Sequence, residues 1–339
     1  MHARSRYDQL STYRSQFLET AVRCSELTLP YLIQRDETRI THQILKQPWQ
    51  SVGAKAVVTL AAKLMLSLLP PQTTFFKLQV RDDKLGTDLP AQVRSELDLS
   101  FAKMERMVMD SIAASSDRVT VHQALKHLVV GGNALIYMGK DGLKNYPLNR
   151  YVVERDGNGN ILEIVTKELI SKELLPKEFQ DSDKAVNRVN DNGSSTGDDV
   201  EVFTHVRLDN NRWLWHQEAL DKKIPGTEGK APKDASPWLV LRWNVVDGES
   251  YGRGRVEEFI GDLKSLEGLM QCMVEGSAAA AKVVFLVSPS ATTKPQSLAK
   301  AQNGAIIQGR PDDVGVVQVG KTADFRTVQE MIQSLTQRL

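Results

Sequence analysis

The chain has 339 residues, of which 41% are hydrophobic and 25% are charged, and its formal net charge is +1. This length and composition are typical of a soluble folded protein with two or three structural units. The near-zero net charge excludes a general attraction to nucleic acid or to an anionic membrane, so any electrostatic contact with DNA must be local. The two cysteines, Cys24 and Cys272, are too few and too far apart for a disulfide framework or a zinc site.

Four helices are predicted in the first 132 residues, where apolar side chains recur every three or four positions. Their expected ranges are 8–29, 51–69, 90–114 and 116–131. Ser51 is the expected N-cap of the second helix, and Gly131-Gly132 is a C-terminal signal for the fourth. The second helix resembles a membrane span, but Lys55 and Lys63 lie within it and its apolar part is short. We therefore interpret it as a buried amphipathic helix and expect no membrane partner.

Antiparallel strands are predicted next, because the period of the apolar residues changes to two after residue 133. Hairpins are expected where 151–155 and 161–165 flank Asp156-Gly157-Asn158-Gly159-Asn160, and where 200–206 and 212–215 flank Asp209-Asn210-Asn211. Residues 181–199 between the hairpins are polar, which predicts a mobile surface loop or an insertion. Further strands are expected at 75–80, 134–138 and 238–246. The first part of the chain is thus predicted to be α+β, with helices followed by antiparallel strands.

A long helix is predicted over residues 255–282, and it carries three kinds of side chain. Apolar residues between Phe259 and Met273 form a stripe along it. Acidic residues occur elsewhere on the helix, namely Glu257, Glu258, Asp262 and Glu267. Small residues lower its intrinsic helicity but let a neighbouring helix approach closely, which predicts lateral packing through Gly261, Gly268, Gly276 and Ala279.

The remainder of the chain predicts a small α/β unit followed by a second helix. Strands are expected at 283–287, 305–308 and 314–319, and a short helix at 295–302. The last helix is expected to begin at Thr327 and to run to Leu339. No glycine or proline ends it, so we expect the natural chain to continue beyond this sequence.

The segment 247–254 supports two incompatible functions. Gly248-Glu249-Ser250-Tyr251-Gly252 fits the nucleophile elbow of a serine hydrolase, because it lies between a predicted strand and a predicted helix. Hydrolases of the α/β type place the catalytic histidine after the serine in the chain, whereas all six histidines here precede Ser250. Serine hydrolysis therefore stays as the alternative, and a tight turn with close helix packing is the favoured interpretation.

No other catalytic site, and no cofactor or metal site, is predicted. Gly252-x-Gly254 lacks the third glycine of a dinucleotide fingerprint, and the chain has no phosphate-binding lysine loop. His122 and His127 are five positions apart, so they do not share a face of their helix as a pair of metal ligands would.

Six short stretches, taken with their order and spacing, resemble the portal protein, or head-to-tail connector, of short-tailed bacteriophages (the podovirus type). The resemblance covers nearly the whole chain. Its most specific stretches are Gln47-Pro48-Trp49-Gln50-Ser51-Val52-Gly53-Ala54, Leu60-Ala61-Ala62-Lys63-Leu64-Met65-Leu66, Ala124-Leu125-Lys126-His127-Leu128-Val129-Val130, Tyr151-Val152-Val153-Glu154-Arg155-Asp156, Asp247-Gly248-Glu249-Ser250-Tyr251-Gly252-Arg253 and Gly309-Arg310-Pro311. The departure is at the C-terminus, where the family continues into a returning stem helix, more of the wing and a crown.

This resemblance implies a portal-type subunit within the α+β class. Residues 1–250 would form a helical and antiparallel-β wing, 251–282 the first stem helix, 283–325 a small α/β clip and 326–339 the start of a second stem helix. The crown would be missing. The family also implies a closed ring of about twelve subunits around a DNA channel.

The resemblance further implies a structural protein rather than an enzyme, without a cofactor, at the portal vertex of the virion. Its expected roles are genome packaging, head–tail joining and DNA ejection, and it would assemble in the host bacterial cytoplasm. The expected partners are double-stranded DNA, a tail adaptor, the packaging terminase, a scaffold, the major capsid protein and internal core proteins. The residues expected to line the channel are Glu257, Glu258, Asp262, Glu267, Lys294, Lys300, Arg310 and Lys321. A scaffold or adaptor that passes no DNA is the second alternative.

Overall fold

The computed structural model describes residues 2–35, 45–71, 73–79, 91–180, 186–189, 195–280, 284–290, 292–301, 306, 308, 310–317 and 322–339. The chain divides into two compact units, Met1–Gly261 and Asp262–Leu339. Both contain helices and antiparallel strands, which confirms the predicted α+β class.

Four long helices open the first unit, as predicted. They are α1 (Ala3–Glu26), α2 (Val52–Leu68), α3 (Ala91–Ala114) and α4 (Asp117–Gly131), and a short α5 (Arg255–Glu258) follows the sheets. Gly132 ends α4 in the left-handed conformation, with φ +73°, which confirms the predicted C-terminal signal. Ser51 makes no side-chain cap of α2, contrary to the prediction. The side-chain carbonyl of Gln50 instead accepts a hydrogen bond from the Gly53 N–H at 2.9 Å.

Two antiparallel sheets make up most of the remaining first unit. The smaller has the strand order β10-β1-β2, and the larger has the order β3-β4-β6-β7-β8, with β5 paired to β6 and β9 paired to β7. The strands are β1 (Asn133–Gly139), β2 (Gly142–Tyr146), β3 (Tyr151–Arg155), β4 (Ile161–Ser171), β5 (Val186–Val189), β6 (Ser195–Asp209), β7 (Arg212–Ala219), β8 (Lys222–Lys223), β9 (Gly229–Pro232) and β10 (Trp238–Arg242). Short 3-10 helices occupy Leu148–Arg150, Lys172–Leu174, Lys177–Phe179 and Lys233–Ala235.

Both predicted hairpins, β3–β4 and β6–β7, are present. In the β3–β4 turn, the Asp156 carboxylate accepts hydrogen bonds from the backbone N–H groups of Asn158 and Asn160, at 3.0 and 2.7 Å. In the β6–β7 turn, Asn210 and Asn211 have φ values of 45° and 66°. Asparagine tolerates this left-handed conformation because its short side chain can hydrogen-bond locally, which is why the turn residues predicted the hairpins.

The prediction of a loop at 181–199 is wrong for the residues of this stretch that the structure describes, 186–189 and 195–199. There β5 pairs antiparallel with the beginning of β6, so that Val186 lies opposite Asp199. Backbone N–H and C=O groups pair whatever the polarity of the side chains, so the polar composition concealed this hairpin. Residues 181–185 and 190–194 lie outside the described residues.

Two other predicted strands need correction. Residues 73–79 do not form a strand; the Leu78 backbone N–H donates to the Glu105 carboxylate of α3 at 2.6 Å rather than to a neighbouring strand. Val80 lies outside the described residues. The strand predicted at 238–246 is β10 alone and ends at Arg242, because the chain then turns and bridges back to itself between Asn244 and Arg253.

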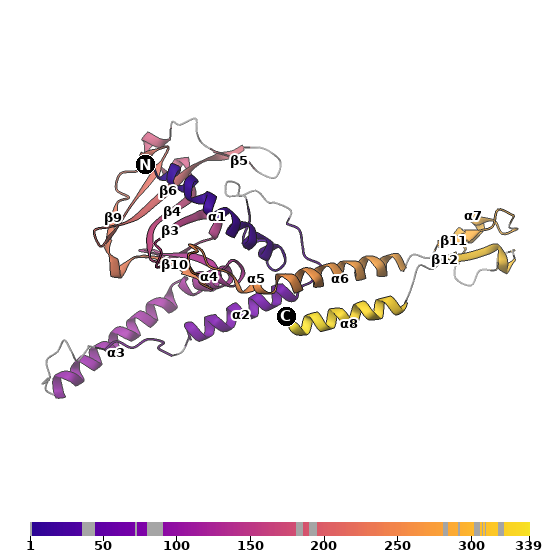
Figure 1. Cartoon of the computed structure of the whole chain (residues 1–339), viewed down its shortest axis with the longest axis horizontal. Coiled ribbons are helices and arrows are strands. Elements are labelled where there is room, and N and C mark those ends of the chain that lie inside the picture. Colours follow the sequence, from indigo (N-terminus) through magenta and orange to yellow (C-terminus); the bar gives the residue numbers. More distant parts are fainter. Residues whose placement is uncertain are drawn as a thin grey trace. The chain divides into compact units, whose positions relative to one another are not determined.

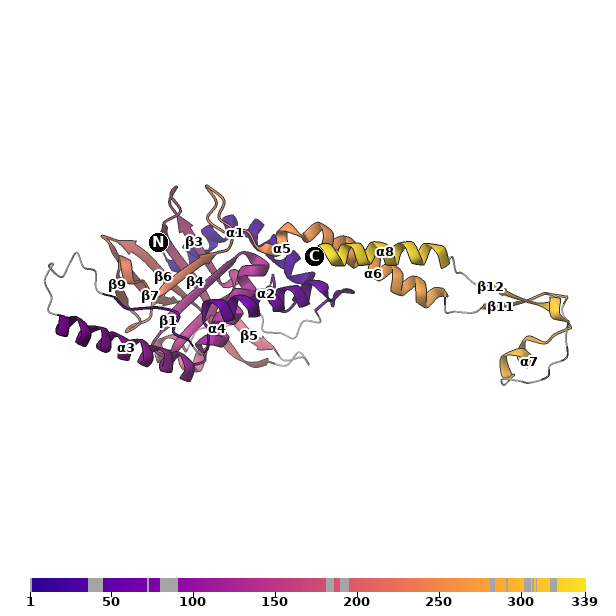
Figure 2. The same cartoon turned by 90° about the horizontal axis from the view of Figure 1, so that it is seen from below.

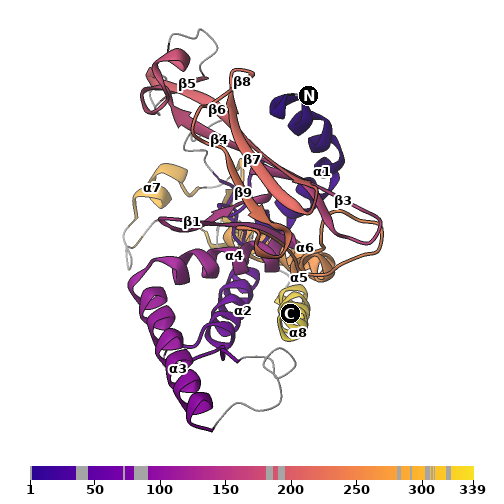
Figure 3. The same ribbon diagram turned by 90° about the vertical axis from the view of Figure 1, so that its left-hand side faces the viewer.

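Helix α1 covers one face of the larger sheet (Figures 1 and 3). Their shared core contains Ala3, Tyr7, Leu10, Val152, Val165 and Phe203. A second core joins α2 and α4 to β1 through Ala61, Ala124, Leu125, Leu128, Ala134 and Ile136. Helix α4 contacts α1, α2, α5 and the smaller sheet, so it is the central packing element of the first unit.

The second unit has α/β elements between two helices, as the sequence predicts. Its elements are α6 (Ile260–Ala280), β11 (Val284–Val287), α7 (Pro295–Lys300), a 3-10 turn (Pro311–Asp313), β12 (Val314–Val317) and α8 (Thr322–Arg338). Strands β11 and β12 pair antiparallel. Of the predicted strand at 305–308, Ile306 and Gln308 are not in a strand and the other two residues lie outside the described ranges. Helix α8 begins at Thr322, before the predicted Thr327.

Helices α6 and α8 lie side by side and antiparallel within this unit (Figures 1 and 2). At one end, Arg338 lies 3.5 Å from the Asp262 carboxylate. At the other, the Phe325 ring lies against Gly276, where an added Cβ would be 3.1 Å from the ring. The absence of a side chain at Gly276 therefore makes room for the aromatic ring of α8.

The predicted continuous helix at 255–282 is interrupted at Phe259. Helix α5 ends at Glu258, the Phe259 N–H donates to the Val256 carbonyl at 3.1 Å, and α6 begins at Ile260. No glycine or proline marks this position. Val256 is buried and α5 packs on α4, so tertiary contacts rather than local propensity set the break.

Candidate functional site

The stretch from Trp243 to Gly254, here called the junction segment, links β10 to α5. It forms a narrow loop in which Asn244 and Arg253 exchange backbone hydrogen bonds, at 3.2 and 2.9 Å. The backbone N–H of Trp243 donates to the Gly132 carbonyl at 2.9 Å. The junction segment therefore rests directly on the C-terminus of α4.

Glycines on both sides make this close contact possible. A Cβ added to Gly254 would lie 2.5 Å from the Val130 carbonyl oxygen, and one added to Gly252 would lie 2.7 Å from the Gly132 carbonyl oxygen. A Cβ added to Gly132 would lie 2.4 to 2.6 Å from backbone atoms of residues 252–254. All these neighbours are backbone atoms, so no side-chain movement could relieve the clash.

The side chain of Asn133 connects the backbone at the end of α4 to the backbone of the junction segment. Its Nδ2 donates to the carbonyls of Gly131 and Gly252, at 2.9 and 2.8 Å, and its Oδ1 accepts from the Gly252 N–H at 2.7 Å. The side chain is buried, so these hydrogen bonds satisfy an amide that would be costly to leave unpaired.

Two further side chains join the junction segment to β3 and α1. The buried Tyr251 hydroxyl accepts a hydrogen bond from the Val153 N–H of β3 at 3.1 Å, and its ring lies 5.3 Å from that of Phe17. Arg253 lies 2.6 Å from the Glu249 carboxylate and 2.8 Å from that of Glu257. These ion pairs raise the pKa of Arg253 above its ordinary value. The start of α5 is thus fixed to α1, α4 and β3.

The geometry around Ser250 does not form a nucleophile elbow. In an elbow the serine lies at a sharp turn between a strand and a helix. Here β10 ends at Arg242 and α5 begins at Arg255, and Ser250 lies in the loop between them. Its carbonyl accepts a hydrogen bond from Arg155 Nε at 3.0 Å. Among the residues that the structure describes, no hydrogen bond joins the Ser250 hydroxyl to a histidine.

The acidic residues predicted for the channel are mostly paired within the chain. Besides the Arg253–Glu257 pair, Glu258 forms an ion pair with Arg255 and accepts a hydrogen bond from Asn244 Nδ2 at 2.8 Å. Asp262 pairs with Arg338 of α8. Glu257 and Glu258 lie on α5, whereas Asp262 and Glu267 lie on α6.

The predicted packing residues of α6 have different surroundings. Gly261 and Gly268 are exposed, and an added Cβ at either position would meet nothing within 4 Å. Ala279 is exposed, and Gly276 is half-buried against Phe325 of the same chain. The first two glycines therefore leave open space on the surface of the helix.

The predicted cations lie apart from α6 in the sequence, around β11 and β12. Lys294 precedes α7, Lys300 ends it, and Arg310 precedes the 3-10 turn; all three are exposed. Lys321 lies outside the described residues.

Asp313 organises the chain between β11 and β12. Its Oδ2 lies 3.0 to 3.2 Å from the backbone N–H groups of Thr292, Thr293 and Arg310 and from both threonine hydroxyls. Desolvation would raise the pKa of Asp313, but the hydrogen bonds from Thr292, Arg310 and Thr293 outweigh it and lower this pKa to about 2. The ionised carboxylate thus connects two segments that are about twenty residues apart in sequence.

Replacing this carboxylate should loosen the loop. We expect Asp313→Ala to speed amide hydrogen exchange at Thr292, Thr293 and Arg310, because their N–H groups lose their acceptor. The wild-type protection should be full above pH 3.8, the ordinary pKa, and should be lost as pH falls through about 2. The neighbouring Asp312→Ala is the control, and equal exchange in both variants would contradict this role.

The chain matches the family of bacteriophage head to tail connecting proteins over residues 1–339. It is 36% identical over 347 aligned positions to the portal protein of Escherichia phage T7, and 37% identical over 348 positions to that of Enterobacteria phage T3. Each alignment covers 99% of this chain. The chain belongs to this family of connecting proteins. The family that the six sequence stretches resemble is thereby confirmed.

This connecting protein spans 63% of the length of each of the two portal proteins. Among solved structures, it is similar to a chain in the neck of an empty GTA particle, with a TM-score of 0.40 and 10% sequence identity, over 85% of this chain and 65% of that one.

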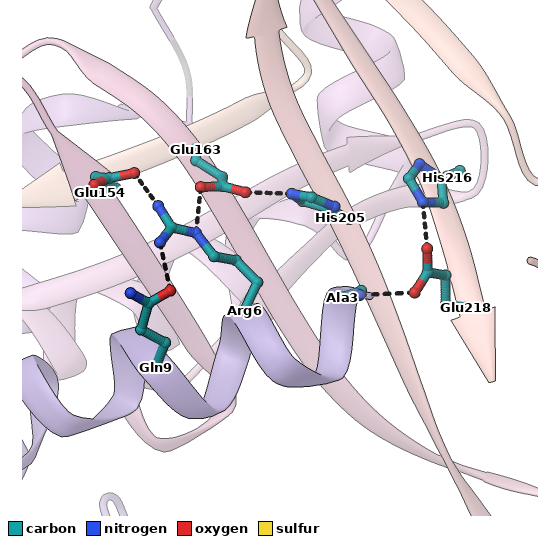
Figure 4. A network of polar contacts seen from close by, with 8 residues as sticks. All are labelled: Ala3, Arg6, Gln9, Glu154, Glu163, His205, His216 and Glu218. Atoms are coloured by element: carbon teal, nitrogen blue, oxygen red, sulfur yellow. Dashed lines mark hydrogen bonds and ion pairs between the residues drawn. The ribbon is translucent and has the colours of Figure 1, made fainter. Parts of the chain in front are cut away.

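The N-terminus of α1 is fixed to the larger sheet by a polar network that the sequence did not reveal (Figure 4). The Ala3 N–H donates to Glu218 of β7 at 2.7 Å, so a carboxylate from another element caps the positive end of the helix. His216 Nε2 lies 2.8 Å from the other oxygen of Glu218. Because the sequence separation is large, no local capping pattern could have predicted this contact.

Arg6 makes the second connection of α1 (Figure 4). Its Nε donates to Glu163 of β4 at 2.7 Å, it also pairs with Glu154, and Glu163 in turn contacts His205 of β6. Burial would raise the pKa of Glu163, but the hydrogen bonds from His205 and Arg6 lower it to about 2. The network therefore keeps a largely buried carboxylate ionised and orients α1 on the sheet of this connecting protein.

Within the described ranges, no group of three or more His, Cys, Asp or Glu side chains is arranged to hold a metal ion. Of the helices described, none combines the length and the apolar character needed to cross a bilayer.

Proposed function

We propose that this chain is the repeating subunit of a ring-shaped portal through which double-stranded DNA passes. The observation that carries the proposal is its membership of the head to tail connecting family over all 339 residues. Genome packaging, head–tail joining and DNA ejection at the portal vertex of the virion are the functions proposed for the ring. The proposed partners are the tail adaptor, the packaging terminase, the scaffold, the major capsid protein and the internal core proteins.

In this proposal the two units have separate roles. Residues 1–250 form the wing, and the end of the junction segment leads into the first stem helix. Residues 251–282 are assigned to the first stem helix, 283–325 to the clip and 326–339 to the start of the second stem helix. The antiparallel pairing of α6 with α8 and the small α/β unit between them support this assignment.

In the stem, neighbouring subunits would pack against the surface of α6 that contains Gly261 and Gly268. The bare surfaces at Gly261 and Gly268 allow a neighbouring helix to approach without a clash at Cβ. Gly276 is used within the chain by Phe325, so it is less suited to a contact between subunits. A closed ring of about twelve identical subunits would repeat this contact around its axis.

We propose that DNA glides along the channel rather than binding to it. Glu257, Glu258 and Asp262 pair with Arg253, Arg255 and Arg338, which prevents these arginines from binding DNA tightly. Glu267 of α6 adds negative charge that repels phosphates. The exposed Lys294, Lys300 and Arg310 provide a few weak phosphate contacts. Passage would then depend little on any single cation.

Packaging with single-lysine variants tests this proposal. We expect Lys294→Ala and Lys300→Ala portals to package DNA nearly as well as the wild type, because each removes one weak, exposed contact and leaves the others in place. Glu267→Lys should instead slow packaging at low salt and recover at high salt, since it adds a phosphate-binding group to the acidic face. The measurement is the amount of nuclease-protected DNA per particle. A complete block by either lysine variant would contradict gliding.

A further inference from the structure

Helix α2 is apolar on nearly all sides, but the single chain covers only one of them. The side that packs on α4 has the buried residues Gly53, Val57 and Ala61. On another side, three residues four positions apart form what we call the α2 stripe: Val58, Ala62 and Leu66. Leu66 is 62% exposed. A helix that is apolar all round is normally buried, so a further protein surface is expected to cover the α2 stripe.

Helix α3 also has an apolar face that the single chain leaves open. No side chain between Gln92 and Ala114 is buried, and α3 extends from α4 away from the sheets (Figures 1 and 3). Four exposed residues at helical spacing form what we call the α3 stripe: Val93, Met104, Met107 and Val108. A helix gains most of its stability by packing an apolar face against another element, so the α3 stripe needs a partner as well.

Opposite charges border the two stripes. Lys55 and Lys63 each precede a residue of the α2 stripe by three positions, and α2 has no acidic residue. Glu96 and Asp110 each follow a residue of the α3 stripe by three positions, with Lys103 between them. Positions three apart are neighbours on the surface of a helix. All four bordering groups are exposed, and none forms an ion pair with another described residue, so all are available to a partner.

A second copy of this chain has the chemistry that both stripes require. In a cyclic ring each subunit contacts its two neighbours through two different patches, which must be complementary to each other. The α2 stripe and the α3 stripe are both apolar and are bordered by opposite charges, so they form such a pair. Within one chain they lie on separate helices that each contact α4.

We propose that the α2 stripe of one subunit packs against the α3 stripe of the adjacent subunit, with Lys55 and Lys63 facing Glu96 and Asp110 across the interface. This inference rests on the ring proposed above and adds a contact between the first units of neighbouring subunits. It is separate from the stem contact, because neither helix belongs to the second unit.

Cross-linking of the full-length protein tests which surfaces meet. The variant Leu66→Cys/Met107→Cys is treated with a short bismaleimide, in a background where the exposed Cys272 is replaced by serine. We expect a ladder of covalently joined chains on a denaturing gel, because each cysteine lies opposite the other cysteine of a neighbour. The matched control is Leu174→Cys/Met107→Cys, since Leu174 is 79% exposed but lies on neither helix, and it should give single chains.

Charge reversal tests the proposed polarity of the same interface. Lys55→Glu/Lys63→Glu should raise the protein concentration needed for half-assembly at least about tenfold, because like charges would then face each other. Adding Glu96→Lys/Asp110→Lys to the same chain should restore assembly. Lys140→Glu/Lys222→Glu changes two exposed lysines of the first unit outside both helices, and it should assemble as the wild type does.

The outcomes separate this contact from the ring itself. Intact rings without a Leu66–Met107 ladder, or rings that assemble equally in every charge variant, would overturn the interface and leave the portal proposal standing. Cross-links confined to single chains would show that α2 and α3 pack within one subunit, and a ladder from the Leu174 control would show unspecific contact; either result would also overturn it. A wild-type protein that forms no ring would contradict both proposals.

Discussion

Gly254→Ala should destabilise the first unit by about 2–3 kcal/mol, one of the largest effects expected of a single added methyl group in this chain. The new Cβ would lie 2.5 Å from the Val130 carbonyl oxygen and 3.0 Å from the Gly132 nitrogen. Both are backbone atoms of the α4 terminus, so either α4 or the junction segment must move. Urea denaturation followed by tryptophan fluorescence measures the loss.

Gly157→Ala provides the matched control for this substitution. Gly157 lies in the β3–β4 turn, and an added Cβ there would meet nothing within 4 Å. Its unfolding free energy should therefore change by no more than about 0.5 kcal/mol. If the two variants unfold at the same urea concentration, the backbone contact between α4 and the junction segment does not contribute to stability, and its proposed role at the base of α5 is wrong.

His127 should make the protein less stable in mild acid. The side chain is 2% exposed, and its Nδ1 has no hydrogen-bond partner among the residues that the structure describes. Burial together with Lys126 lowers its pKa from 6.5 to about 4. The unfolded chain therefore binds a proton between these pH values that the folded chain does not. Stability is full above pH 6.5 and falls as pH decreases to about 4, by a total of about 3 kcal/mol from this residue.

The slope of stability against pH isolates the contribution of His127. His127→Gln should flatten the curve between pH 6.5 and about 4 relative to the wild type. The same change at His122, which is only partly buried in the same helix, should flatten it less. Parallel curves for wild type and His127→Gln would show that the imidazole binds a proton equally in the folded and the unfolded state, and would contradict the account.

Local sequence signals predicted most elements of the first unit. Gly132 predicted the end of α4. It adopts the left-handed conformation there, which costs free energy for a residue with a Cβ atom but not for glycine. The β6–β7 hairpin follows from Asn210 and Asn211 for the same physical reason. These signals work because they are properties of a few neighbouring residues and do not depend on distant parts of the chain.

Contacts between distant segments could not be predicted in this way. The break at Phe259 depends on how α5 packs against α4, and the cap of α1 comes from Glu218, far along the chain. The buried Asn133, which joins α4 to the junction segment, follows a glycine pair and has no motif of its own. A long-range contact map, rather than periodicity, would be needed to find these residues.

The serine motif illustrates how a local pattern can mislead. Gly248-x-Ser250-x-Gly252 satisfies the spacing of a nucleophile elbow, but its glycines have other functions in this fold. Gly248 has φ +77° in the turn, and Gly252 approaches the α4 backbone. The chain order of the histidines had already argued against a hydrolase, and the position of Ser250 in a loop agrees with that argument.

Native mass spectrometry of the full-length protein, supported by electron microscopy, tests the central claim most directly. The account predicts a closed ring of about twelve subunits with a central hole wide enough for a DNA duplex. A ring without such a hole would favour a scaffold or adaptor that passes no DNA. A protein that stays monomeric or dimeric would contradict the portal proposal.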